Sequence, residues 1–141
     1  MKKRANVEYF FRQNDSKSCG VCVVNTILKM FGLPGAIFSV NAKRGTSPKR
    51  ILQELRKAGL VAVSKTISIR NLKPRSILWY PFPRDHYVVV GDIADGKALI
   101  YDSERKEPYW CHLSILKKKW YGGGGKSHGW VIEVTKPTGE K

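Results

Sequence analysis

Residues 19–32 have the sequence CGVCVVNTILKMFG, and this stretch predicts an amphipathic helix. Its apolar residues recur at helical spacing, with the polar residues on the opposite face. Gly32 suits the left-handed position that ends many helices, so the predicted helix covers residues 19–31. Ser18 is a suitable N-cap, which places Cys19 at the first position of the helix.

The rest of the chain predicts a second helix and then a sheet. Ser47 and Pro48 are typical of a helix start, so a helix is expected over residues 48–58. After it the apolar residues fall in short runs, as in strands. Helices followed by strands indicate an α+β fold, with the first helix packed on an antiparallel sheet. The expected strands cover 60–64, 76–80, 86–92, 97–102, 109–112 and 129–134, with a short helix near 113–120.

The length and composition are those of one globular domain. The chain has 141 residues, of which 42% are hydrophobic and 11% aromatic. A chain of this size buries enough surface to fold without disulfides or a structural metal. We therefore expect a single domain over residues 1–141, with a core from about 10 to 135 and basic tails at both ends.

The charge balance is strongly basic. With 26 Lys and Arg against 11 Asp and Glu, the net charge is +15. Such a surface attracts polyanions, so weak, non-specific polyanion binding is expected. A nucleic-acid-associated protein is therefore an alternative, although no helix-turn-helix, zinc-finger or RNA-recognition pattern accompanies the charge. The basic clusters are Lys2–Arg4, Lys43–Arg50, Arg70–Arg75 and Lys117–Lys119.

The cysteine content and the hydropathy indicate a cytoplasmic protein. Three cysteines, an odd number, do not suggest a disulfide framework. The apolar stretch that follows the basic N-terminus is too short for a signal peptide. No apolar run is long enough to predict a transmembrane helix. The sequence carries no signal for an oligomeric state.

Cys19 is chemically poised if it opens a helix. The helix macrodipole places partial positive charge there, which favours thiolate over thiol. Backbone N–H groups of the first turn have no intrahelical partner and can donate to an oxyanion beside the sulfur. Gly20, the next residue, would let a substrate backbone approach closely.

A cysteine nucleophile needs a base, and His86 and Asp102 are the candidates. His86 begins the most apolar predicted strand, and Asp102 ends the next one. A two-residue turn at Asp95-Gly96 would place Asp102 opposite Val89, on the face away from His86. A three-residue loop, residues 94–96, would shift the pairing by one residue and bring both side chains to one face. The catalytic interpretation therefore predicts the three-residue loop.

These segments together resemble the C39 peptidase family, a group of papain-like bacterial cysteine peptidases. The resemblance extends over nearly the whole chain, from about Gln13 to Val134. It is carried by Gln13-x-Asp15-x-x-x-Cys19-Gly20, a helix ending at Phe31-Gly32, Leu55-x-x-x-Gly59-Leu60, His86-Tyr87-Val88-Val89-Val90, Ile100-Tyr101-Asp102 and Trp120-Tyr121-Gly122.

The resemblance implies a peptidase with a defined set of catalytic residues. Cys19 would be the nucleophile, His86 the general base and Asp102 its orienter, while Gln13 would donate to the oxyanion hole. The implied reaction is hydrolysis of a peptide or protein substrate, after Gly-Gly or another small residue, without metal or organic cofactor. The expected form is a stand-alone domain, since no transporter sequence accompanies it. A non-catalytic peptide-binding module is the alternative.

The sequence departs from the family pattern at three positions. Ser18 stands where an acidic residue is frequent, Cys22 where a small residue is usual, and Ser103 where proline follows the aspartate. None of these changes removes a catalytic group. The first two bear on substrate preference.

The cysteines allow other interpretations. Cys19 and Cys22 form a C-x-x-C pattern, but the polar segment before them does not predict the strand of a thioredoxin-like unit. A zinc site could add Cys111 and His112, although the spacing is not that of a common finger. Cys22 is either a core residue or the partner of Cys19 in a reversible disulfide. Residues 122–125 are four glycines, interpreted as a flexible loop or, as the alternative, a self-cleavage site.

Overall fold

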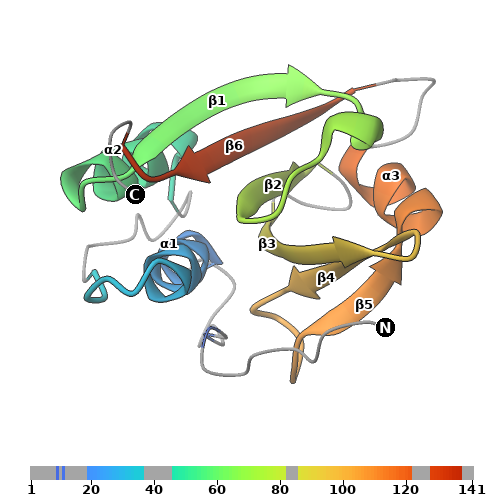
Figure 1. The fold of residues 1–141 in the computed structure, drawn as a ribbon, viewed down its shortest axis with the longest axis horizontal. Helices are drawn as coiled ribbons and strands as arrows, with labels where there is room; N and C mark the ends of the chain where they lie inside the picture. The colour runs from blue at the N-terminus through green and yellow to red at the C-terminus, as the bar shows by residue number, and fades with distance from the viewer. Residues whose placement is uncertain are drawn as a thin grey trace.

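A six-stranded sheet with helices on both faces forms the molecule (Figure 1). The computed structural model describes Tyr9, Phe11 and residues 19–36, 46–81, 86–121 and 128–137. The helices are α1 (Cys19–Met30), α2 (Pro48–Lys57), the short 3-10 helix η2 (Ile69–Asn71) and α3 (Leu113–Tyr121). The strands are β1 (Val61–Ile67), β2 (Ser76–Tyr80), β3 (His86–Ala94), β4 (Lys97–Tyr101), β5 (Tyr109–His112) and β6 (Gly129–Thr135).

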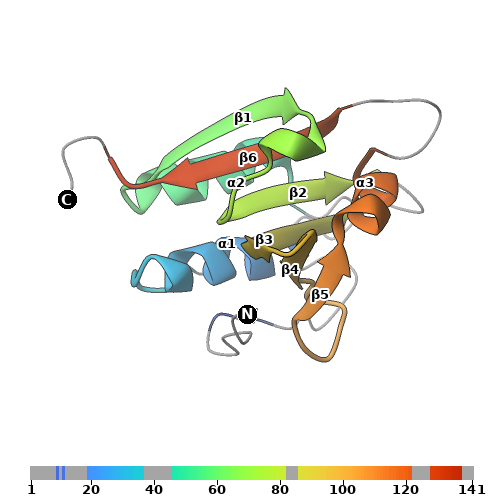
Figure 2. The ribbon, with the colours of Figure 1, turned by 45° about the vertical axis from the view of Figure 1, so that its right-hand side comes forward.

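The strands pair in the order β1-β6-β2-β3-β4-β5, and every pair is antiparallel. The helices α1 and α2 lie on one face of this sheet and α3 lies on the other (Figures 1 and 2). This arrangement confirms the expected α+β fold with the first helix packed on an antiparallel sheet. None of the helices in the described ranges is long and apolar enough to cross a membrane.

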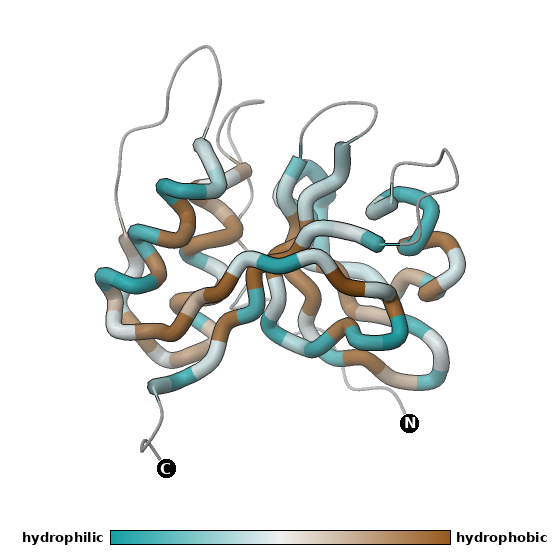
Figure 3. Tube along the Cα trace, turned by 90° about the horizontal axis from the view of Figure 1, so that it is seen from above, coloured by the Kyte–Doolittle hydropathy of each residue, from teal (hydrophilic) through white to brown (hydrophobic). Residues whose placement is uncertain are grey.

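The sheet separates two hydrophobic cores. Side chains of a strand alternate between faces, and in β3 Tyr87 and Val89 enter the core under α1 and α2 while Val88 and Val90 enter the core under α3. Figure 3 shows the hydrophobic positions gathered where helices and strands meet, with hydrophilic ones on the outer turns. The structure therefore has a helical layer (α1 and α2) and an α3 layer, each with its own apolar contacts.

Local signals fix the ends of the helices as predicted. Gly32 has a φ of 70°, and its N–H donates to the carbonyl of Lys29 while the next N–H reaches Leu28. This pair of bonds is a Schellman motif, which requires the left-handed conformation that glycine adopts without steric cost. At the start of α2 the Ser47 hydroxyl accepts from the N–H of Arg50 at 3.2 Å. The predicted N-cap Ser18 lies outside the described residues.

The predicted strands agree closely with those observed. β2 and β5 match residue for residue, whereas β1 runs three residues further than the predicted 60–64, to Ile67. The extension pairs with strand β6. Between the two strands Trp130 Nε1 donates to Ser64 Oγ at 2.7 Å, and Lys65 Nζ forms an ion pair with Glu133 Oε1 at 2.9 Å. Polar residues in this segment obscured the strand pattern in the sequence.

The β3–β4 hairpin corrects the predicted loop. Ala94 pairs with Lys97, so the turn has two residues, Asp95 and Gly96, with φ values of 54° and 73°. The prediction of a three-residue loop is therefore wrong. The pairing shifts instead between Val90 and Ile93, where two residues of β3 oppose one of β4. This β-bulge provides the extra residue.

The bulge restores the register that the catalytic interpretation needs. Beyond it Val90 pairs with Ile100 and Val89 with Tyr101. Because faces alternate along each strand, Asp102 then lies on the same face as His86. The glycine run at residues 122–125 lies outside the described ranges. The expectation of one domain over residues 1–141 stays a prediction.

Candidate active site

Cys19 is the first residue of α1, as the sequence predicts. Its side chain is a free thiol and the residue is 7% exposed. At this position the sulfur is near the N–H groups of the first helical turn, which have no partner within the helix. The N-terminus of a helix carries partial positive charge, which favours negatively charged groups beside it.

Gly20 packs against the loop before α2, which differs from the role predicted for it. A Cβ at Gly20 would lie 2.3 Å from Cβ of Thr46, so no side chain fits between them. Thr46 is buried, and its carbonyl accepts from the Tyr87 hydroxyl at 3.1 Å. Thr46 thus connects the first turn of α1 with β3, one residue from His86. The sequence did not predict this contact of Thr46, because it joins segments that are far apart in the chain.

His86 and Asp102 meet where β3 begins and β4 ends. His86 Nε2 lies 2.7 Å from Asp102 Oδ1, and the residues are 6% and 7% exposed. Asp102 Oδ1 also accepts from the backbone N–H of Glu104 at 3.0 Å. The carboxylate is therefore held by the turn that follows β4, and it fixes the orientation of the imidazole.

Cys19 completes this arrangement on the other side of the His86 ring. Burial lowers the pKa of His86, but hydrogen bonds to Asp102 and to Cys19 and the charges of both groups outweigh it, and the pKa rises to about 9. Since Nε2 faces Asp102, Nδ1 is the nitrogen left for the thiol. The structure brings three of the four predicted site residues together. The fourth, Gln13, lies outside the described residues.

Two tyrosines lie near this group, Tyr80 buried and Tyr109 partly buried. Tyr80 pairs with His86 across β2 and β3, and the two ring centroids are 6.4 Å apart. Burial raises the pKa of both Tyr80 and Tyr109, so they remain neutral. Their hydroxyl groups are buried without a hydrogen-bond partner in the described parts of the chain. A setting of low polarity strengthens the electrostatic interactions of the neighbouring His86 and Asp102.

Glu104 is a residue of this group that the sequence analysis missed. Its Oε1 lies 3.7 Å from His86 Nε2, and its side chain is 32% exposed. Ligand atoms of His86, Asp102 and Glu104 all lie within 4.8 Å of one another, a spacing that a metal ion could also use. The short His86–Asp102 hydrogen bond accounts for the pair without an ion. Only the position of Glu104 two residues after Asp102 marked it in the sequence.

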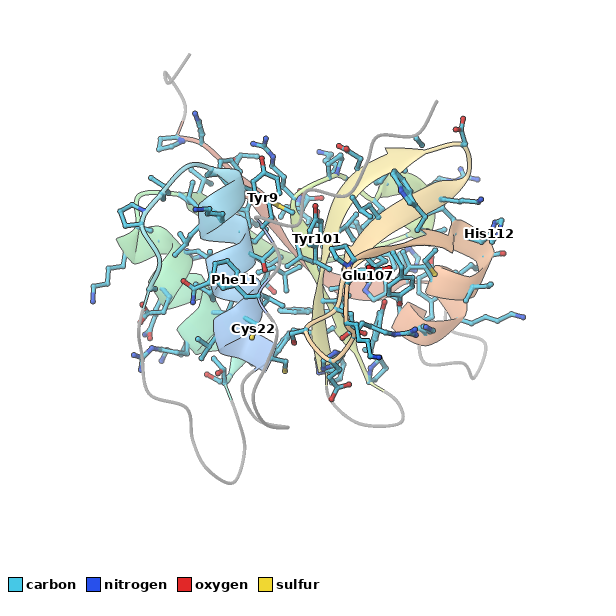
Figure 4. All side chains as sticks on the ribbon, turned by 90° about the horizontal axis from the view of Figure 1, so that it is seen from below. Tyr9, Phe11, Cys22, Tyr101, Glu107 and His112 are labelled. Atoms are coloured by element: carbon cyan, nitrogen blue, oxygen red, sulfur yellow. The ribbon has the colours of Figure 1, made fainter. Side chains whose placement is uncertain are left out.

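The alternative of a zinc site that joins Cys19 and Cys22 with Cys111 and His112 is wrong. Cys19 contributes to the core under α1 and α2, whereas Cys111 contributes to the core under α3, on the opposite face of the sheet. Figure 4 shows Cys22 on α1 and His112 at the far end of the molecule. The entirely antiparallel pairing of the described strands also differs from the βαβ unit of a thioredoxin-like site. The disulfide between Cys19 and Cys22 stays a hypothesis.

The raised pKa of His86 predicts a specific pH dependence of stability. Because the folded-state pKa of about 9 exceeds the ordinary histidine value of 6.5, folding favours the charged ring. Its contribution to the free energy of unfolding is full below about pH 6.5 and lost as the pH rises through about 9. We expect it to reach on the order of 3 kcal/mol. Urea unfolding of the wild type and His86→Gln from pH 6 to 9.5 measures this contribution.

The difference between the two proteins isolates the histidine from other titrating groups. It should shrink as the pH rises, because the variant has no ring to deprotonate. A difference that stays constant or grows over this range would contradict the ion pair at His86.

Comparisons with known proteins place the chain in a family. A model of the peptidase C39 family matches residues 7–123, whereas no curated protein sequence matches the chain significantly. The peptidase domain of Streptococcus ComA, a bi-functional ABC transporter involved in quorum sensing, has a similar fold. It is 18% identical with a TM-score of 0.71, over 89% of this chain and 96% of that one.

Two further solved structures share the fold. A double glycine motif protease from an AMS/PCAT transporter, in complex with the leader peptide, is 15% identical, with a TM-score of 0.70 over 91% of both chains. The N-terminal peptidase C39 like domain of a toxin secretion ATP-binding protein from Vibrio parahaemolyticus is 14% identical, with a TM-score of 0.64 over 89% of this chain and 100% of that one. Since the family model covers most of the sequence, the chain belongs to the peptidase C39 family of cysteine-type peptidases.

Proposed function

We propose that this chain hydrolyses peptide bonds with Cys19 as nucleophile, His86 as general acid and base, and Asp102 as the group that orients the imidazole. The observation that carries this proposal is the buried His86, whose Nε2 lies 2.7 Å from Asp102 Oδ1 and whose pKa is raised by both Asp102 and Cys19. A nucleophile, a base and an orienter within hydrogen-bond reach are the arrangement that activated nucleophiles require.

The proposed reaction follows from these positions. The Cys19 thiolate attacks the carbonyl carbon of the scissile bond, and the carbonyl oxygen becomes an oxyanion. The backbone N–H of Cys19 and the side-chain amide of Gln13 donate to that oxyanion. The protonated His86 gives its proton to the leaving amine. It then accepts a proton from water, which attacks the acyl-enzyme and releases Cys19. The role of Gln13 rests on the resemblance to the family, with Gln13 six residues before Cys19.

The proposed substrate is a peptide or protein cut after Gly-Gly or another small residue. One solved protein of this fold is a double glycine motif protease that binds a leader peptide, and membership of the same family supports the same substrate class.

Alkylation of Cys19 across pH tests the catalytic pair without knowledge of the substrate. Iodoacetamide reacts with thiolates, and a free thiol ionises only near pH 8.5. We expect Cys19 to be alkylated faster in the wild type than in a chain without the His86 imidazole, because the protonated ring stabilises the reacting thiolate. Peptide mapping by mass spectrometry after timed labelling identifies the reacting cysteine, and Cys19→Ala should lose this label.

The matched variant is His86→Ala, which keeps the helix start and removes the imidazolium. It should move the alkylation of Cys19 toward the pH range of an ordinary thiol. If Cys19 in the wild type already reacts like a free thiol, or if His86→Ala leaves the pH profile unchanged, the proposed pair is wrong.

A further inference from the structure

We propose that Glu104 is a positioning residue that supplies a second carboxylate to His86 and keeps its ring protonated during catalysis. The inference deepens the proposed function and rests on it, since His86 must act there as the general acid. Glu104 belongs neither to the three residues that form the Cys19–His86–Asp102 arrangement nor to the motifs that relate the sequence to its family.

Glu104 contacts the His86–Asp102 pair in two ways. Its backbone N–H donates to Asp102 Oδ1 at 3.0 Å, and the same oxygen lies 2.7 Å from His86 Nε2. Its carboxylate Oε1 lies 3.7 Å from that nitrogen. The backbone of Glu104 therefore holds the orienting oxygen in place, while its side chain adds negative charge at the same edge of the ring.

The charges that face His86 show what a second carboxylate adds. Cys19 faces the ring from α1, the neutral Tyr80 from β2, and Asp102 and Glu104 from the turn after β4. Arg105, the next residue in that turn, stacks on Tyr109 with its guanidinium carbon 4.5 Å from the ring centroid. Glu104 is thus the second carboxylate at the ring in the described part of the chain.

The second carboxylate stabilises the imidazolium most when the nucleophile reacts. Before attack, the imidazolium has the Cys19 thiolate and Asp102 as negative partners. Once the sulfur bonds to the substrate carbon, its negative charge moves to the oxyanion, further from the ring. The protein carries a net charge of +15, whose field disfavours another cation. The Glu104 carboxylate stays 3.7 Å from the ring nitrogen and offsets part of this loss.

The test compares Glu104→Gln with Glu107→Gln, a neutralisation in the same loop. Both variants remove one negative charge and keep the backbone N–H, but Glu107 makes no ion pair with the described residues. The pH midpoint of His86 is read from its imidazole NMR signals, and the alkaline limit of peptide hydrolysis from initial rates. We expect Glu104→Gln to lower both by roughly half a pH unit to one unit, because the charge lies 3.7 Å from the ring nitrogen, and Glu107→Gln to leave both in place.

The outcomes separate this inference from the proposed function. Equal midpoints in Glu104→Gln and Glu107→Gln, in a chain whose Cys19 alkylation depends on His86, would overturn the role of Glu104 alone. The His86 midpoint could instead be lowered only in Glu104→Gln while the chain neither hydrolyses peptides nor shows His86-dependent alkylation. That result would support the contact between Glu104 and His86 and overturn the peptidase mechanism. Melting temperatures of both variants should match the wild type, so a lowered midpoint is not a sign of general destabilisation.

Discussion

Peptide hydrolysis is expected to fall by about two orders of magnitude when Gly20 is replaced by alanine. The new Cβ would lie 2.3 Å from Cβ of Thr46, which is closer than two non-bonded carbon atoms can approach. The first turn of α1 must move away from the loop before α2, and Cys19 moves with it. A displacement of about 1 Å at a reacting atom is enough for this loss. Initial rates on a Gly-Gly peptide, with alkylation of Cys19 at pH 6.5, measure it.

A second substitution distinguishes displacement from unfolding. Thr46→Gly removes the atom that the new methyl group meets, so Gly20→Ala combined with Thr46→Gly should recover much of the activity lost in Gly20→Ala. Recovery is expected with Thr46→Gly because the clash is with Cβ of Thr46. Thr46→Ser keeps this Cβ and should therefore not restore the activity. Full activity in Gly20→Ala alone would show that the contact between the two segments is not needed.

The stability of the fold is expected to fall by about 3 kcal/mol in Gly129→Ala. Gly129 begins β6 against Trp120 of α3, and a Cβ there would lie 2.3 Å from Cε2 of the indole ring. Trp120 is 1% exposed, and its Nε1 donates to the carbonyl of Trp130 at 2.7 Å. A rigid, hydrogen-bonded ring cannot yield, so α3 must shift from the sheet. Urea unfolding monitored by fluorescence gives the free energy.

A double-mutant cycle with Trp120→Leu assigns the cost to this contact. Leucine leaves room for the methyl group, so adding Gly129→Ala to Trp120→Leu should cost less than about 1 kcal/mol. If the two substitutions were additive, the loss would come from the backbone at Gly129 rather than from the indole ring.

The helices and most strands were predictable because their signals are local. The apolar spacing in residues 19–31, the cap at Ser47 and the short runs of β2 and β5 each specify their own segment. The three residues Cys19, His86 and Asp102 were predicted together, because each stands at the end of such an element. In the structure His86 Nε2 lies 2.7 Å from Asp102 Oδ1, and Cys19 raises the pKa of the same ring.

The remaining features depend on how distant segments meet. A three-residue loop was predicted where the structure has a two-residue turn at Asp95-Gly96. The error arose because a β-bulge has no sequence signature strong enough to reveal it before the strand pairing is known. Thr46 contacts Gly20, and Glu104 contacts His86, only after the sheet and α1 have packed. Neither residue belongs to a motif, so packing alone revealed them.

The division of the molecule into two layers has a consequence for how the enzyme would fail. Cys19 belongs to the core of the helical layer, whereas Val88 and Val90, which lie on the same face of β3 as His86, belong to the core of the α3 layer. Proteins open in cooperative parts at lower free energy than that of global unfolding. Detachment of α1 alone would separate sulfur from imidazole while the strands stay paired, so heat inactivation would follow the weaker of the two layers rather than the melting of the whole chain.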